Sequence, residues 1–159
     1  MTAKAKLSDI VGAVETHFDE MTSYLDRQTG RVVAFQDEEI RAAEDDEDPS
    51  DFPEWQQDQI RLAKEFLAAE GTGRFVSFPD QFEISEWDMM RDFAQDLDDE
   101  GHAEALLRAI QGKGAFRYFK DRVHELGLAE KWYAFRNDQY RRIALDWCRD
   151  NNVEVDENE

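Results

Sequence analysis

The apolar residues of this chain follow different periods in its two halves, and this change limits the folds that the chain can adopt. Residues 21–25 and 31–35 are β-rich and flank a five-residue connection that ends in Gly30, a pattern typical of a β-hairpin. A third short β-rich run covers residues 74–78. From residue 102 onward the spacing is helical only. The sequence therefore predicts an α+β fold, with a small three-stranded antiparallel sheet and a mostly helical C-terminal half.

Capping residues mark where the helices are expected to begin. Ser8 can cap a first helix, and Pro53 fits the start of a second. Ser85 with Asp88 three residues later resembles a capping box for the next one. Glycines then divide the helical half into segments at residues 102–111, 115–126 and 132–150.

The segment 115–126 has an apolar face. Phe116, Phe119, Val123 and Leu126 recur at helical spacing, so both phenylalanines are predicted to lie in the core.

The length of 159 residues suits one domain. We expect a single α+β domain over residues 1–152, followed by an acidic tail at residues 153–159. Residues 37–51 are expected to form an acidic mobile loop. Within it, residues 44–48 are five consecutive acids that repel one another, which favours a solvated loop or a frayed helix.

The charge of the chain is strongly negative and unevenly distributed. It carries 38 acidic and 19 basic side chains, a formal net charge of −19. Residues 1–100 have a net charge of −18, whereas residues 101–150 have a net charge of +3. Duplex nucleic acid and anionic membranes attract positive surfaces, so neither is expected as a partner. The excess of acidic residues has three alternative explanations: solubility, biased coding, or mimicry of a nucleic-acid backbone.

The segment from Gly112 to His124 is the candidate site for an anion. Its basic residues recur at helical spacing and share one face, and the two glycines permit close approach to the N–H groups at the helix start. The spacing does not match a phosphate-binding P-loop. The alternative is a solvated face, or an internal ion-pair surface that balances the acidic half. The candidate anion-binding residues are Gly112, Lys113, Gly114, Arg117 and Lys120.

The sequence indicates no catalytic group, no metal site and no cofactor, so an enzyme is not the favoured reading. The histidines at positions 17, 102 and 124 do not have the spacing of metal ligands. Cys148 is expected to be a buried small hydrophobe. The acidic run lacks the alternation and the glycine of a calcium loop.

One string of the chain is distinctive. Residues 109–121 read AIQGKGAFRYFKD, and they accompany Ser23-Tyr24-Leu25-Asp26, Phe78-Pro79 and Trp132-Tyr133. Together these segments resemble the bacterial uncharacterised protein family 0158, over roughly residues 7–152. The family has no assigned activity, so the resemblance implies a bacterial cytoplasmic protein and no particular chemistry.

These observations favour a non-catalytic cytoplasmic module for protein interaction or regulation. The alternative is a small protein or enzyme that binds a phosphate-bearing small molecule at the Gly112–His124 face. A weaker alternative is an acidic mimic of nucleic acid. The N-terminus lacks the apolar segment of a signal peptide, and no apolar run is long enough to cross a membrane. The oligomeric state stays open.

Overall fold

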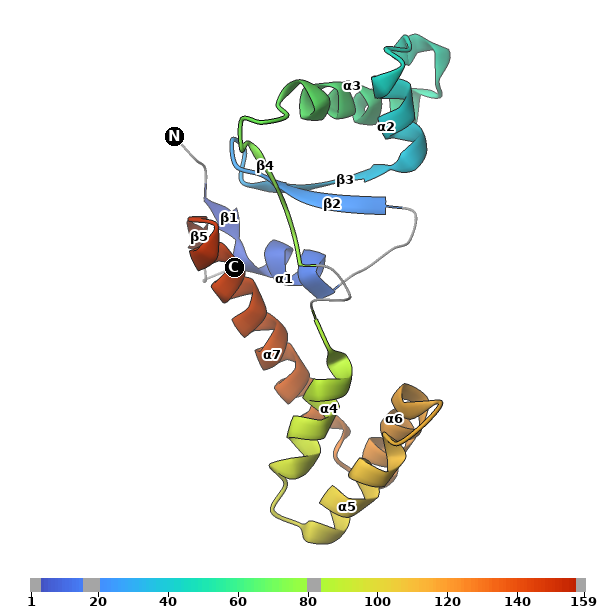
Figure 1. The fold of residues 1–159 in the computed structure, drawn as a ribbon, viewed down its shortest axis with the longest axis vertical. Coiled ribbons are helices and arrows are strands. Elements are labelled where there is room, and N and C mark those ends of the chain that lie inside the picture. The colour runs from blue at the N-terminus through green and yellow to red at the C-terminus, as the bar shows by residue number, and fades with distance from the viewer. Residues whose placement is uncertain (1–3, 16–20, 80–83, 157–159) are drawn as a thin grey trace. The chain divides into compact units, whose positions relative to one another are not determined.

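The structure, a computed structural model, describes residues 4–15, 21–79 and 84–156. It confirms the α+β class, with a three-stranded antiparallel sheet in the first half and helices in the second (Figure 1). The elements in chain order are β1 (Ala5–Lys6), α1 (Leu7–Glu15), β2 (Met21–Asp26), β3 (Arg31–Gln36), α2 (Asp37–Glu44), η1 (Pro49–Asp51), α3 (Glu54–Ala68), β4 (Phe75–Ser77), α4 (Glu86–Gln95), α5 (Glu100–Ala109), α6 (Ala115–Glu125), α7 (Ala129–Asp150) and β5 (Val155–Asp156).

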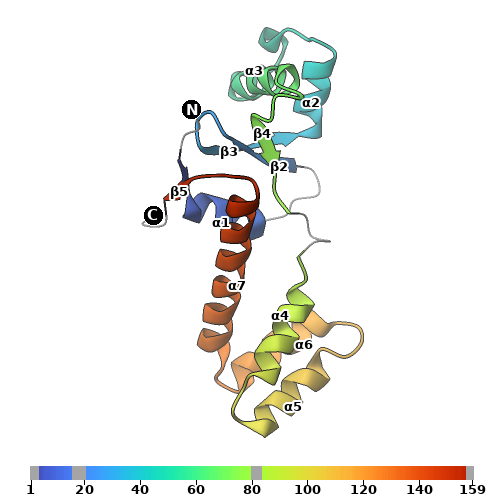
Figure 2. The same cartoon turned by 60° about the vertical axis from the view of Figure 1, so that its left-hand side comes forward.

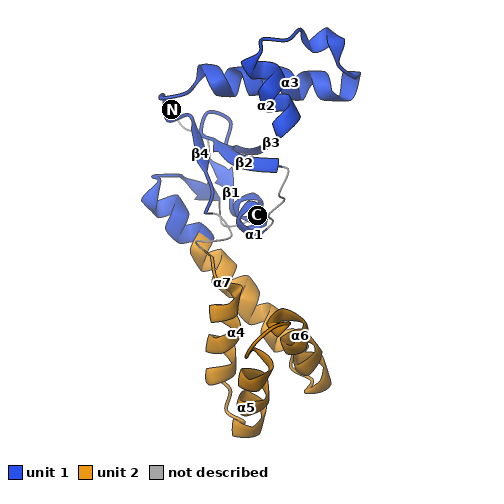
Figure 3. Ribbon diagram, turned by 45° about the vertical axis from the view of Figure 1, so that its right-hand side comes forward, with its two compact units in different colours: residues 1–80, 144–159 blue, residues 81–143 orange. Residues whose placement is uncertain are grey.

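The chain divides into two compact units (Figure 3). Unit 1 comprises residues 1–80 and 144–159, and unit 2 comprises residues 81–143. Helix α7 contributes residues to both units. The expectation of a single domain over residues 1–152 stays a prediction.

The sheet of unit 1 has the strand order β3-β2-β4. Strand β2 pairs antiparallel with both neighbours, and Tyr24 lies opposite Val33 on one side and Ser77 on the other. The predicted hairpin at residues 21–35 is therefore present. Its tight connection is closed by the Gly30 N–H, which donates to the carbonyl of Asp26 at 2.8 Å.

The two faces of this sheet are covered by different helices (Figures 1 and 2). Helices α2 and α3 lie over one face, where Phe35 packs with Phe66 at 5.2 Å between ring centroids. Helix α1 lies on the other side, and its buried residues are Leu7, Ile10 and Val14. Because side chains alternate along a strand, Leu25 belongs to the face opposite Tyr24. Both faces of β2 are thus used in packing.

The acidic stretch at residues 37–51 differs from the expected loop. Residues 37–44 form helix α2, and residues 49–51 form a short 3-10 helix. Ala43 packs with Phe35 of the sheet and Ala63 of α3, and Ala42 is also buried. This burial anchors a helix that the acidic composition alone would disfavour. Asp46 also pairs with Lys64 of α3 at 3.2 Å. The loop assignment was wrong for residues 37–44, while the mobility of the stretch stays a prediction.

The C-terminal segment also differs from the expected tail. Val155 and Asp156 form a two-residue strand that pairs in parallel with Ala5 and Lys6. A pair of such short strands has no periodicity that a sequence pattern can reveal. Before it, the Trp147 indole of α7 donates to the Ser77 carbonyl at 3.0 Å within unit 1.

Unit 2 consists of helices packed around aromatic rings. Phe93 of α4 contacts Phe119 of α6 and Trp132 of α7, at 6.3 and 5.4 Å between centroids. Ser85 caps α4, as predicted, by accepting a hydrogen bond from the Asp88 N–H at 3.2 Å. This core fixes which side of α6 faces outward.

Candidate functional site

The turn between α5 and α6 holds the two glycines of the candidate site. Gly112 and Gly114 have φ values of +89° and +78°, in the left-handed region that glycine adopts without strain. A Cβ on Gly114 would also lie 3.0 Å from the Tyr118 ring, one turn along the helix. Lys113 therefore stands between two positions that favour glycine, immediately before the start of α6.

Helix α6 buries one narrow side. Ala115, Phe119 and Val123 are its buried residues, spaced by four, and Phe119 is only 1% exposed. Each residue turns the helix by about 100°, so Phe116 points well away from Ala115. Phe116 is 57% exposed, and its predicted place in the core is wrong.

The exposed side next to Phe116 is basic. Arg117, Lys120 and His124 are all exposed, and helical spacing places them within about a quarter-turn sector that continues from Phe116. Asp121 falls outside that sector. We call the set of Lys113, Phe116, Arg117, Lys120 and His124 the α6 basic face.

The cations of this face form no ion pairs with the residues that the structure describes. Among the residues that the structure describes, Lys113, Arg117 and Lys120 form no salt bridge with an acidic side chain. Other basic residues of unit 2 do have carboxylate partners. The pairs are Arg91–Asp88, Arg108–Glu104, Arg122–Glu125, Arg136–Glu86 and Arg142–Asp138, with N–O distances between 2.6 and 3.2 Å. Within the described residues of unit 2 these cations therefore lie on an exposed face without ion pairs, and the internal ion-pair surface with the acidic half stays a prediction.

The edges of the α6 basic face are defined by two aromatic residues. His124 meets the Tyr133 ring of α7 edge-on, at 6.4 Å between centroids. Tyr118 is 56% exposed, but it lies on the opposite flank with the Arg122–Glu125 pair and packs on Gly114. Phe116 is thus the apolar residue among the cations, a feature that the sequence pattern assigned to the core.

Unit 1 contains a buried ion pair that sequence reasoning missed. Asp26, 2% exposed, accepts two hydrogen bonds from the Arg74 guanidinium, at 3.0 and 2.9 Å. Burial acts to raise the pKa of Asp26, but the Arg74 hydrogen bonds, the Gln28 N–H and the Arg74 charge outweigh it and lower the pKa. The same hydrogen bonding raises the pKa of Arg74. The pair joins strand β2 to the residue that precedes β4.

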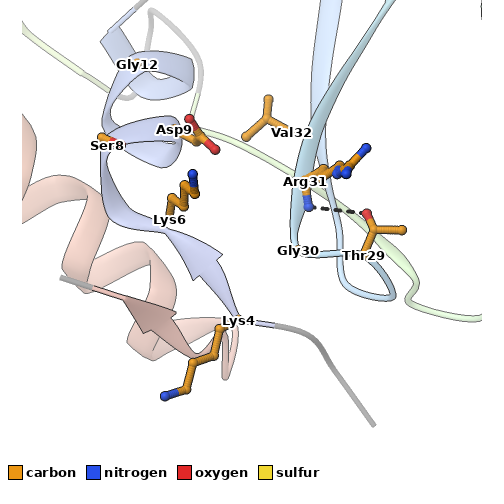
Figure 4. A pocket seen from close by; sticks show the side chains of 9 residues that line it. All are labelled: Lys4, Lys6, Ser8, Asp9, Gly12, Thr29, Gly30, Arg31 and Val32. Atoms are coloured by element: carbon orange, nitrogen blue, oxygen red, sulfur yellow. Dashed lines mark hydrogen bonds between the residues drawn. The ribbon is translucent and has the colours of Figure 1, made fainter. Parts of the chain in front are cut away.

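A cavity of about 640 Å³ also lies in unit 1, between α1 and the β2–β3 hairpin (Figure 4). Lys6, Ser8 and Asp9 line it from one side, and Thr29 and Arg31 line it from the other. None of these residues was singled out as a site residue from the sequence. A second cavity, of about 700 Å³, is lined by residues of α4, α5 and their flanks.

The cysteine and the histidines were considered in the sequence as possible catalytic or metal-binding groups. Cys148 is buried, as expected, and burial raises the pKa of its thiol to about 11, so the thiolate is scarce at neutral pH. His102 lies beside Asp99 at 3.7 Å, and His17 is outside the described residues. Within residues 4–15, 21–79 and 84–156, no cluster of three potential metal ligands is found. The same residues include no helix with the length and apolar character needed to span a bilayer.

Fold and site together define an acidic α+β protein that presents an exposed basic helix face. The model of a family described as "Uncharacterised protein family (UPF0158)" matches residues 4–159, so the chain belongs to this family and the resemblance noted above is confirmed. The chain is similar to the UPF0158 protein PA5073 of Pseudomonas aeruginosa, with 37% identity over 68 residues. That match covers 42% of this chain and 44% of the relative. No solved structure matches the chain.

Proposed function

We propose that this protein is a non-catalytic interaction module that binds an acidic segment of a partner protein through the α6 basic face. One observation carries the proposal: Lys113, Arg117 and Lys120 surround the exposed Phe116 and form no salt bridge among the described residues. In a chain with twice as many acids as bases, cations that gather on one helix face and form no ion pair among the described residues leave a local positive potential.

The dimensions of the face favour a short peptide segment. From Phe116 to His124 the helix rises about 12 Å, which equals about four residues of extended chain. Phe116 offers apolar contact area, and the cations beside it pair with carboxylates. Neither of the two cavities described above is lined by Lys113, Arg117 or Lys120, so an extended partner suits this open face better than an enclosed small molecule.

The surrounding charge disfavours nucleic acid as the occupant. Residues 86–109 of the same unit hold eight acidic and two basic side chains. A long polyanion would place many phosphates near those carboxylates, whereas a short acidic peptide needs only the three cations of the face. Phe116 is also a single exposed ring, and single-stranded bases bind best to successive stacking platforms.

Fluorescence anisotropy tests the proposal directly. The probe is a labelled peptide of about eight residues in which Glu and Leu alternate, so that about four residues can contact the face. Saturable binding is expected, and Lys113→Ala with Arg117→Ala should weaken it about tenfold or more. Phe116→Ala should weaken it less, by the loss of one apolar contact.

The matched control is Arg108→Ala with Arg122→Ala. This pair removes the same charge from unit 2, but both arginines already have carboxylate partners. Equal loss of affinity in both double variants would mean that only net charge matters and would contradict the proposal. So would the absence of saturable binding, or tighter binding of a labelled single-stranded RNA or of inorganic phosphate to the same face.

The same proposal places the protein in the bacterial cytoplasm. Its support is the bacterial source of the relative. Cell fractionation of the bacterium with an antibody to the chain tests this, since a membrane or secreted fraction would contradict it.

A further inference from the structure

The cavity of about 700 Å³ in unit 2 combines an apolar lining with acidic side chains. It is formed by the end of α4, the connection to α5 and one side of α5, and we call it the α4–α5 cavity (Figures 1 and 2). Half-buried Leu97, Ala103 and Leu107 provide its apolar lining, and exposed Asp98 and Glu100 also line it. Its volume falls in the range of ligand pockets, so it suits an occupant with both an apolar group and positive charge.

The acids around this cavity have few cations nearby. Residues 95–104 hold five acidic side chains and no Lys or Arg. Among the lining residues Arg108 is the single cation, and it is already paired with Glu104 at 2.6 Å. Asp98 and Glu100 form no ion pair with any residue that the structure describes. These two carboxylates are therefore available to cations of another molecule.

The α6 basic face has the complementary properties. Residues 113–120 hold three basic side chains and no acidic one. Phe116 is 57% exposed and is the apolar group among the cations. Charged groups at an interface are arranged so that a positive patch meets a negative one, and an exposed aromatic ring is the usual anchor that enters a pocket. The face and the cavity match on both counts.

Within one copy of the chain these two surfaces do not contact each other. Among the described residues, none that belongs to α6 lines the α4–α5 cavity. None of Lys113, Arg117 and Lys120 forms an ion pair with a described acid. Two whole chains of net charge −19 repel each other, so a contact between copies must bring local opposite charges together, as this face and this cavity do.

We propose that the partner whose acidic segment binds the α6 basic face is a second copy of this chain, which presents its α4–α5 cavity. This inference rests on the function proposed above and names the partner. Phe116 of one copy enters the cavity of the other copy. Lys113 and Arg117 lie beside Phe116 and pair with the two available carboxylates of the cavity. Each copy carries both surfaces, so two copies related by a two-fold axis make the contact twice and form a closed pair.

Sedimentation equilibrium of the full-length chain tests the proposal. The chain is studied from about 1 μM to about 1 mM, at about 0.15 M salt, where repulsion between exposed charges is screened beyond about 8 Å. The wild type should show a reversible equilibrium between monomer and dimer. Two variants reverse one surface each: the face variant is Lys113→Glu with Arg117→Glu, and the cavity variant is Asp98→Lys with Glu100→Lys. Each should weaken the dimer more than tenfold, because like charges then meet.

An equimolar mixture of the two variants gives the sharpest readout. In a mixed pair, the reversed face of one variant meets the reversed cavity of the other, and the two original surfaces meet each other. The mixture should therefore form a heterodimer at concentrations where each variant alone is monomeric. Circular dichroism checks that both variants are folded. If the cavity variant does not fold, Asp98→Asn with Glu100→Gln replaces it and should weaken the wild-type dimer about tenfold.

The matched control is Arg122→Glu with Arg142→Glu. It makes the same change in net charge as the face variant, but neither arginine belongs to the α6 basic face or lines the cavity, and both already have carboxylate partners. This control should dimerise as the wild type does, and it should not form a heterodimer with the cavity variant at concentrations where that variant alone is monomeric.

Three results would overturn the proposal. They are a wild type that stays monomeric at about 1 mM, equal weakening of the dimer by the control and the face variant, or a mixture of face and cavity variants that stays monomeric. A monomeric wild type that still binds the acidic Glu–Leu peptide would overturn this inference alone and leave the proposed function in place. The absence of both self-association and peptide binding would contradict both proposals.

Discussion

The β2–β4 edge of unit 1 and helix α6 of unit 2 use their basic side chains in opposite ways. Arg74 is mostly buried and donates two hydrogen bonds to the nearly inaccessible Asp26. Lys113, Arg117 and Lys120 are exposed and form no salt bridge among the described residues. A cation of the first kind stabilises the fold, whereas cations of the second kind are available for a ligand. Substitutions can separate these two roles.

The largest expected effect on stability concerns the two phenylalanines of α6, one buried and one exposed. Phe119→Ala should lower the free energy of unfolding by about 3–5 kcal/mol, because the ring packs against Trp132 at 4.8 Å and Phe93 at 6.3 Å. Phe116→Ala should lower it by less than about 1 kcal/mol, since that ring is 57% exposed. Urea unfolding measures both. A similar loss for the two variants would show that Phe116 is also packed, and the α6 basic face would lose its apolar residue.

The next largest effect on stability concerns the buried Asp26–Arg74 ion pair. Asp26→Asn should lower the free energy of unfolding by about 3 kcal/mol, because it leaves the mostly buried Arg74 charge with only the more distant Glu65 carboxylate, at 3.6 Å. Asp58→Asn is the control, since it breaks the exposed Arg61–Asp58 pair and should cost about 0.5 kcal/mol or less. If both variants lose the same small amount of unfolding free energy, the Asp26–Arg74 pair behaves like a surface pair and the contrast between the two regions is contradicted.

The same pair should contribute to the dependence of stability on pH. The pKa of Asp26 is lower in the folded protein than its ordinary value of 3.8, so the unfolded chain binds the proton more readily. The stabilisation is present above pH 3.8 and is lost as the pH falls through the lowered pKa. Unfolding measured from neutral pH down to about pH 2 should therefore show a steeper acid loss for the wild type than for Asp26→Asn. Parallel curves would contradict this assignment.

The sequence predicted the order of most elements because each depends on local signals. The hairpin follows from two β-rich runs around Gly30, and α4 follows from the Ser85 cap, which the structure confirms. Short strands such as β1 and β5 carry no such signal, because two residues cannot show a period. Helix α2 was not predicted, because its acidic composition favours a loop and the packing of Ala43 against Phe35 of the sheet arises only in the folded chain.

The candidate site was also predicted in part, because only some of its features depend on local signals. Helical spacing correctly placed Arg117 and Lys120 together on the outer side of α6. It could not decide which apolar residue faces inward, because Phe116 and Phe119 both border the apolar stripe and only contact with α4 and α7 selects Phe119. The Asp26–Arg74 pair joins residues 48 positions apart, and no local pattern reports such a contact. The cavity beside Arg31 depends on the same tertiary arrangement.

The smallest expected effect tests whether the α6 cations have a structural role. Lys113→Ala with Arg117→Ala should change the free energy of unfolding by no more than about 0.5 kcal/mol, because no ion pair among the described residues is lost. The double variant makes an acidic chain two charges more negative, so a small loss from general repulsion is expected, and added salt should remove it. Arg108→Ala with Arg122→Ala makes the same change in charge and also breaks two surface pairs, so urea unfolding of both variants at low and high salt separates the contributions. A loss above about 1 kcal/mol that persists in high salt, for the Lys113 and Arg117 variant alone, would mean that these cations contact acidic groups of the folded chain. The α6 face would then be an internal ion-pair surface, and the contrast with the Asp26–Arg74 pair would disappear.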